Sequence, residues 1–325
     1  MKTDKPDAKL MALPRIIGSY TGPERGPLLC CIGGMHGNEL AGVRALEIVF
    51  KMLELEPMVN HEFSYKGKLI GLRGNLRALE RGVRFIKRDL NRMWTEELVQ
   101  YVRHSPTTLL QAEERELKEL LELLEREVNA YQPDKIILLD IHTTTAHGGI
   151  FSIATDDPES IRIATNLHAP VITGMLRGLS GTTLHWFVPE HFGGTPTTGV
   201  AFEAGQHQDP LSVNRSISAI INCMRSIGAV KPEDVENRHD KLLITYAKGL
   251  PKIAELRYVY HIREGEHFHM IPGFKNFQPV RKGQALAYNE SGLIAAPIDG
   301  RILMPLYQSK GEDGFFIVEE VPYRQ

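Results

Sequence analysis

Two histidines and two glutamates stand where they could hold and use a metal ion. His36 and Glu39 lie three residues apart in GGMHGNE, directly after the apolar run 26–34. His142 follows the run KIILLDI, and Glu203 closes the run TGVAFE. Two imidazoles and one carboxylate, with a fourth position left for water, form a catalytic zinc set. A further carboxylate could then take the proton of that water.

The surrounding segments should bring these residues to one edge of a sheet. The runs 26–34, 135–141 and 198–204 are short and apolar, which predicts buried strands. Apolar residues at helical spacing over 40–56 and 209–227 predict helices after the first and third of these strands. Ligands of an open α/β sheet bind outside the carboxyl ends of its strands, so the three loops are expected to converge. An HxxE pattern occurs often by chance, and the joint placement is what indicates a metal site.

Asp140 and the charged segment 84–94 lie beside these candidates. Asp140 faces away from Ile141 in a strand and could orient His142 as an acceptor for its second ring nitrogen. The segment RFIKRDLNRMW is basic but interrupted by apolar residues, so it is either a solvated loop or an anion-binding segment. In the second case an arginine binds a carboxylate and Asn91 donates beside it. Next to a zinc site, recognition of a substrate carboxylate is the better interpretation.

Two kinds of pattern divide the rest of the chain. Before residue 230, a strand over 68–72, a turn and short helix after it, and an amphipathic helix over 107–128 with a solvated charged face complete an α/β pattern. Beyond that point helical spacing disappears. Turns at 298–300 and 312–314 separate short strand-like runs over 256–262, 284–288, 292–296, 301–306 and 315–318. We predict a mixed, largely parallel sheet flanked by helices over 1–250 and a smaller all-β domain over 251–325.

Composition narrows the class of protein. The chain has 325 residues, 42% of them hydrophobic and 24% charged, with a net charge of -2 that favours neither nucleic acid nor a membrane as partner. Cys30, Cys31 and Cys223 have no metal or disulfide spacing, which predicts free thiols. The first nine residues are polar and no apolar run could cross a bilayer, so we expect a cytoplasmic protein.

Four segments resemble one known family. GGMHGNE, RFIKRDLNR, DIHTTT and FEAG are similar to the signature regions of the succinylglutamate desuccinylase/aspartoacylase family, in the same order and at similar separations. That family is a branch of the zinc carboxypeptidase-like fold. The resemblance covers roughly residues 27–205. It implies one Zn²⁺ per chain, bound by His36, Glu39 and His142, with Glu203 as general base and acid.

The same resemblance implies a substrate and a reaction. Arg84 would help the metal to polarise the scissile carbonyl, and Asn91 and Arg92 would bind a substrate carboxylate. The reaction would be hydrolysis of a small N-acyl amino acid to a carboxylate and a free amine. The C-terminal β-domain would cap the site and narrow it against larger peptides.

The sequence also departs from the aspartoacylase pattern. A second substrate-binding arginine expected about ten residues before the catalytic glutamate is replaced by Gly193, and the nearest upstream arginine is Arg177. A tyrosine expected from the C-terminal domain is replaced by Phe315 and Phe316, with Tyr307 the nearest tyrosine. These changes leave the hydrolytic residues intact but do not support a specificity for acetylaspartate.

Other functions fit parts of the same pattern. A metallocarboxypeptidase acting on small peptides would use the same residues. The run APIDGRIL looks like a biotinyl/lipoyl-type hairpin, but the surroundings of Lys310 do not match a carrier motif. An inactive, ligand-binding homologue is disfavoured because all the ligands and the glutamate are present. The oligomeric state is left open.

Overall fold

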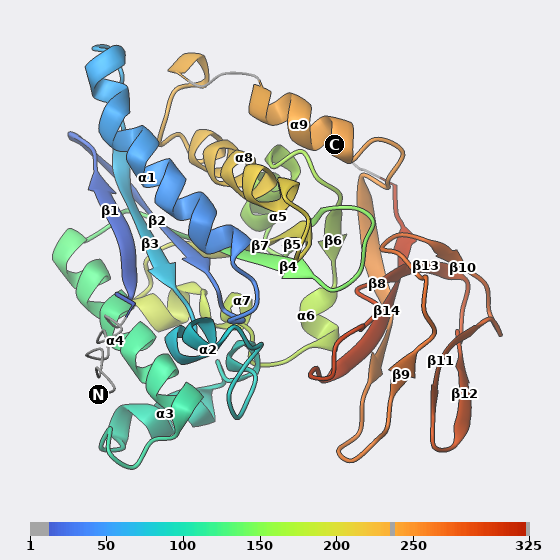
Figure 1. The fold of residues 1–325 in the computed structure, drawn as a ribbon. Coiled ribbons are helices and arrows are strands. Elements are labelled where there is room, and N and C mark those ends of the chain that lie inside the picture. Colours follow the sequence, from blue (N-terminus) through green and yellow to red (C-terminus); the bar gives the residue numbers. More distant parts are fainter. Residues whose placement is uncertain (1–12, 235–237, 323–325) are drawn as a thin grey trace, which may run out of the picture.

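The computed structural model describes residues 13–234 and 238–322, with the elements labelled in Figure 1. The strands are β1 Ile16–Thr21, β2 Glu24–Gly33, β3 Lys66–Arg73, β4 Ile136–Thr144, β5 Phe151–Ala154, β6 Val171–Thr173, β7 Thr197–Gln206, β8 Ile253–His261, β9 His269–Met270, β10 Pro279–Val280, β11 Ala285–Asn289, β12 Gly292–Ala295, β13 Gly300–Leu303 and β14 Asp313–Glu320. The α-helices are α1 Ala41–Val59, α2 Leu76–Arg81, α3 Glu96–His104, α4 Ala112–Tyr131, α5 Pro158–Asn166, α6 Met175–Gly178, α7 Thr183–Trp186, α8 Leu211–Ser226 and α9 Arg238–Tyr246. Single 3-10 turns span Leu90–Arg92, Pro189–Phe192 and Pro232–Asp234.

One long mixed sheet organises the molecule. Its strand order in the described chain is β1-β3-β2-β4-β7-β5-β6-β8-β14-β13-β10. Strands β3, β2, β4 and β7 are mutually parallel, whereas β1 and β5 run antiparallel to their neighbours β3 and β7. The predicted α/β class with a smaller antiparallel region near the C-terminus is confirmed.

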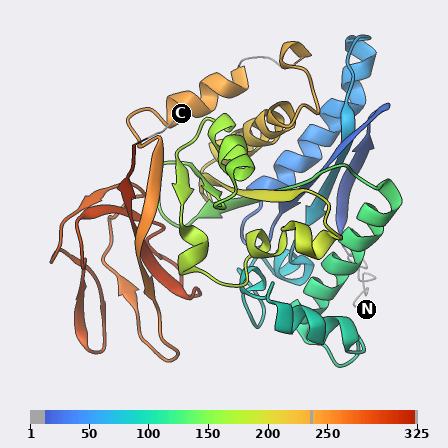
Figure 2. The same cartoon turned by 180° about the vertical axis from the view of Figure 1, so that it is seen from behind.

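Helices cover both faces of the parallel strands, which explains why these strands are apolar along their whole length (Figures 1 and 2). Neighbouring side chains of β2 enter different cores, with Cys30 on one face of the sheet and Cys31 on the other. Helices α3, α4 and α7 pack on the Cys30 side, and α1, α5 and α8 pack on the Cys31 side. The three cysteines are buried and free, as the sequence predicts.

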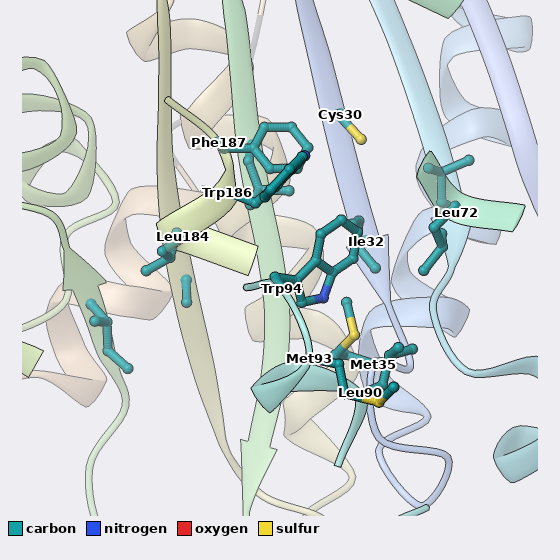
Figure 3. Packing of buried hydrophobic residues seen from close by; sticks show 14 of the residues in the cluster. Cys30, Ile32, Met35, Leu72, Leu90, Met93, Trp94, Leu184, Trp186 and Phe187 are labelled. Carbon is teal, nitrogen blue, oxygen red and sulfur yellow. The ribbon is translucent and has the colours of Figure 1, made fainter. Parts of the chain in front are cut away.

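Aromatic side chains fill the core on the side of α3, α4 and α7. Trp94, Trp186 and Phe187 belong to this cluster together with residues of β2 and β3 (Figure 3). Leu90 and Met93 are buried in the same cluster. The segment that follows Arg84 is therefore anchored by its apolar residues, while the polar residues between them are left to face the sheet edge.

The sheet continues across the predicted boundary at residue 250. Strand β8 pairs in parallel with β6, and β14 then pairs with β8 in the antiparallel sense. A separate three-stranded sheet, β12-β11-β9, packs over this end through a third apolar cluster. Four of the C-terminal strands, β8, β14, β13 and β10, are thus hydrogen-bonded into the same sheet that carries the predicted site.

Several local predictions are wrong. Helical structure does not stop near residue 230, since α9 spans Arg238–Tyr246, and the turn expected at 312–314 is the start of β14. Helix α4 begins only at Ala112, and its charges are not all solvated, because Glu113 and Glu116 are buried. Among the described residues, no helix is long and apolar enough to cross a membrane.

Candidate active site

His36, Glu39 and His142 come together at the carboxyl edge of β2 and β4. The Glu39 carboxylate lies between the rings, with Oε1 at 2.8 Å from His36 Nδ1 and Oε2 at 3.2 Å from His142 Nδ1. Candidate ligand atoms of the three residues all lie within 4.8 Å of one another, and all three residues are buried. Two imidazole nitrogens and a carboxylate suit Zn²⁺, and this trio is the group of metal-ligating type found in the described chain.

A glycine allows the loop before α1 to take this position. A Cβ placed on Gly37 would lie 2.1 Å from the backbone carbon of Ala78 in α2. The Gly37 amide also donates to the carbonyl oxygen of Arg84 at 3.1 Å. The loop carrying His36 and Glu39 therefore packs directly against the segment carrying Arg84.

Each histidine has a carboxylate behind it. His36 Nε2 lies 3.0 Å from Asp89 Oδ1, and His142 Nε2 lies 3.0 Å from Asp140 Oδ2. Such partners fix the ring orientation and leave the opposite nitrogen for a metal. The proximity of Asp140 agrees with the sequence-based expectation, but the expected hydrogen bond is not formed: His142 Nε2 has no hydrogen-bond partner among the described residues, and Asp140 Oδ2 accepts from Thr183 Oγ1 at 2.6 Å. Asp89 was not singled out, although it is the one acidic residue within the basic segment 84–94.

These acids determine the charge of the site. Burial lowers the pKa of His36 and His142, but Asp89, Asp140 and Glu39 outweigh burial and raise the pKa of both rings. Burial likewise raises the pKa of Glu39, and the two histidines outweigh it, so the pKa of this carboxyl lies well below its usual range. The site thus attracts positive charge, which a bound metal ion supplies in place of the imidazole protons.

Glu203 stands beside the ligands on the neighbouring strand. It is the register partner of His142 in the parallel pair β4 and β7, and it is buried. Its Oε2 has no hydrogen-bond partner among the described residues. Burial raises the pKa of Glu203 to about 7, so this carboxyl could both accept and return a proton near neutral pH.

The segment after Arg84 brings two guanidinium groups to the pocket. Arg84 Nη2 donates to Asp89 Oδ2 at 2.8 Å, and its Nη1 lies 3.5 Å from Glu39 Oε1. Arg92 Nη2 donates to Asp313 Oδ2 at 2.6 Å. Asn91 Oδ1 accepts from the Thr183 amide at 3.0 Å, which ties this segment to α7. Arg84, Asn91 and Arg92 all line the same pocket as the metal ligands.

A buried carboxylate at the start of α4 binds the backbone of the segment that follows Arg84. Glu113, in the first turn of α4, accepts backbone hydrogen bonds from Ile86 at 2.6 Å, Lys87 at 3.0 Å and Arg88 at 3.3 Å. One turn later, Glu116 accepts from the backbone amides of Leu76 and Arg77 at the start of α2. These two acids explain why part of the charged face of α4 is buried.

Comparison with known proteins identifies the family. A family model described as the succinylglutamate desuccinylase/aspartoacylase catalytic domain matches residues 25–216. The chain belongs to this family. A protein named probable aspartoacylase from Nostoc sp. is 30% identical over 137 residues, and an N-acyl-aromatic-L-amino acid amidohydrolase (carboxylate-forming) from Xenopus tropicalis is 28% identical over 142 residues. The matched segment spans 42% of the length of each of these relatives and 42% and 43% of this chain.

Solved structures of the family share the fold over nearly the whole chain. A succinylglutamate desuccinylase/aspartoacylase from Rhodobacter sphaeroides matches with a TM-score of 0.61 at 16% identity, covering 92% of this chain and 87% of its own. A mutant of murine aminoacylase 3 matches with a TM-score of 0.58 at 16% identity, covering 92% of this chain and 95% of its own. The likeness includes the C-terminal strands, which the family model does not reach.

The residues that depart from the aspartoacylase pattern lie away from the pocket, with one exception. Gly193 ends a 3-10 turn and has no neighbouring atoms around the place of a Cβ, and Arg177 is exposed and pairs with Glu255 at 2.7 Å. The Tyr307 hydroxyl bonds to the backbone of the C-terminal region. Phe316 lines the pocket, whereas Phe315 is buried in the C-terminal core.

In this family member the pocket contains further residues that sequence reasoning missed. His207 follows β7, lines the pocket, and holds Thr143 Oγ1 at 2.7 Å from its Nδ1. Asp313 reaches the pocket from β14 and pairs with Arg92. The place of His207 directly after FEAG and Gln206 was a weak signal for it. The sequence around Asp313 gave no signal.

Proposed function

We propose that this protein is a zinc-dependent hydrolase that cleaves the amide bond of small N-acyl amino acids. The geometry around Glu39 carries this proposal, because one buried carboxylate faces the Nδ1 atoms of His36 and His142 while separate acids occupy their Nε2 sides. His36, Glu39 and His142 would hold one ion per chain. When bound, the ion lowers the pKa of its water and polarises the scissile carbonyl.

The chain's own residues would supply the proton transfers. Glu203, buried beside His142, would take a proton from the attacking water and deliver it to the leaving nitrogen. Water adds to the carbonyl carbon, the carbon–nitrogen bond breaks, and a carboxylate and an amine leave. Arg84, with its guanidinium 3.5 Å from Glu39, would donate to the carbonyl oxygen as negative charge develops there.

Substrate orientation would come from Asn91 and Arg92. Both line the pocket next to Arg84, and a guanidinium with an amide donor suits a single carboxylate. We also propose that residues 1–250 form the catalytic unit and that residues 251–325 cap it, because Met304, Leu306 and Phe316 form part of the wall of the pocket. This wall favours small substrates over long peptides.

A hydrolysis screen tests the proposal. Protein of measured zinc content would be offered N-acetyl, N-formyl and N-succinyl amino acids and short peptides with free C-termini, with and without chelator. We expect amino acid release from an N-acyl substrate and its loss with chelator. Cleavage of peptides alone would identify a metallocarboxypeptidase instead. If no compound is hydrolysed by protein with stoichiometric zinc, both the deacylase and the carboxypeptidase functions are rejected.

A further inference from the structure

The carboxylate-binding arginine of the pocket already holds a carboxylate of the protein. Arg92 donates to Asp313 Oδ2 at 2.6 Å and to the Asn91 carbonyl oxygen at 2.9 Å, and its side chain is only 18% exposed. The other oxygen of Asp313 lies 2.8 Å from His261 Nδ1, so this buried acid is held from both sides. Part of the guanidinium fork remains for a ligand, but its charge is largely compensated.

The pocket offers little positive charge for a second carboxylate. Among the described lining residues, Arg84 and Arg92 are the arginine or lysine side chains, and Arg84 faces Asp89 and Glu39. Glu312, exposed at the rim next to Asp313, adds negative charge on the same side. A substrate with two carboxylates would place like charges close together, which is costly in a partly desolvated site.

The part of the pocket wall next to Glu203 is apolar. Ala201 and Ile153 are register partners, two residues along strands β7 and β5 from the pair of Glu203 and Phe151. Both line the pocket, and the side chain of Ala201 is small. The apolar cluster that contains both residues contributes further lining residues, namely Leu176, Leu179, Leu184 and Phe316. An apolar group of several carbon atoms would be buried there. Its burial would stabilise the complex by about 25 cal/mol for each Å² of apolar surface removed from water.

We propose that the site selects N-acyl amino acids with one carboxylate and an apolar group, and that Asp313 enforces this choice by occupying Arg92. The proposal rests on the proposed deacylase function and adds the substrate class to it. It makes Asp313 a specificity-determining residue: removing its charge would free Arg92 and admit acidic substrates.

The substrates N-acetyl-L-leucine and N-acetyl-L-aspartate test this choice, because their side chains are similar in shape and differ in charge. We expect the wild-type kcat/KM to favour the leucine substrate by about 100-fold. Asp313→Asn should reduce that preference about tenfold or more, through a gain on the aspartate substrate. Glu312→Gln, at an exposed position of the pocket lining, should shift the preference in the same direction by a smaller factor.

A control removes a carboxylate from the same strand without touching the pocket. Glu319 lies on β14, is 61% exposed and pairs with Arg257, so Glu319→Gln should leave the preference unchanged. Thermal unfolding of each variant checks that the fold is retained. The inference is overturned if the wild type hydrolyses both substrates equally, or if a folded Asp313→Asn keeps the wild-type preference.

A binding measurement separates this inference from the proposed function. Butyrate and succinate, which carry one and two carboxylates, would be titrated into the same proteins by calorimetry. Asp313→Asn should gain affinity for succinate relative to butyrate. If no N-acyl substrate is hydrolysed at all, the deacylase proposal fails, and the titration alone decides whether Asp313 controls carboxylate selection.

Discussion

At the inner end of the pocket, each histidine of the proposed metal site has a carboxylate beside it, and the proposed ligands come from the ends of adjacent parallel strands. At the outer end, part of the wall over Arg92 comes from β14. Contacts between residues far apart in the chain fix it, among them the ion pair of Arg92 with Asp313 across 221 residues and the bond from Lys310 to the carbonyl oxygen of Phe85. Short motifs therefore place the residues of the inner end, while contacts between distant parts of the chain place those of the outer end. Chemistry and selectivity can therefore change independently in this fold.

Removing a ligand is the strongest way to break the inner end. His36→Ala deletes one of the nitrogens that face Glu39, and we expect loss of bound zinc and of all hydrolysis. Zinc content measured by mass spectrometry checks the result, with the exposed His104 of α3 replaced by Ala as a histidine control outside the pocket. Near-stoichiometric zinc in His36→Ala would remove this residue from the ligand set.

Glu203→Gln separates metal binding from proton transfer. The amide keeps the shape of the side chain but cannot take a proton, so the rate should fall by about 10²–10⁴-fold. Zinc content should remain that of the wild type, because Glu203 is absent from the proposed ligand group. A variant that turns over at the wild-type rate would contradict the role of Glu203 as general base.

The carboxylates beside the two histidines should give graded effects. Asp89→Asn weakens the support of His36, and Asp140→Asn weakens that of His142, so each should lower zinc affinity by about 10–100-fold. Competition with a chromogenic chelator measures these affinities. Asp89 also holds Arg84, so Asp89→Asn should reduce kcat further at saturating zinc, whereas Asp140→Asn should not. Identical kcat values for the two variants would dissociate Asp89 from Arg84.

The smallest expected effect concerns Glu113, which binds the backbone of the segment after Arg84. Glu113→Gln turns an amide donor toward the backbone amides of Ile86 and Lys87, at a cost of about 1–3 kcal/mol in the free energy of unfolding. Denaturant unfolding measures this cost, and KM should rise because the loop carrying Arg84, Asn91 and Arg92 loosens. Glu122→Gln, on the same helix at a position 52% exposed, should change stability by less than about 0.5 kcal/mol. Equal effects of both variants would make Glu113 an ordinary helix residue.

The inner end was predictable because its signals are local. A strand that ends in a glycine loop, followed by HxxE, places His36 and Glu39 at the sheet edge, and the run KIILLDI does the same for Asp140 and His142. Their convergence then follows from parallel strand order.

The features that were not predicted depend on long-range contacts, which cannot be recognised in a short stretch of sequence. Asp313 looked like part of a turn, and only the pairing of β14 with β8 brings it to the pocket. Glu113 looked solvated because it lies in a charged stretch at the start of an amphipathic helix, but the loop after Arg84 covers that turn. Helix α9 has one fully buried apolar residue, Leu243, so its periodicity was too weak to detect.

The place of β14 in the sheet has a consequence for the order in which the molecule can assemble. On the ribosome this strand emerges after all the others described, yet it lies between β8 and β13, which cannot take their final neighbours until it arrives. The proposed metal ligands and Glu203 are synthesised much earlier. A nascent chain can therefore form the sheet edge that carries them while Arg92 still lacks Asp313 and the outer edge of β8 is exposed to other chains.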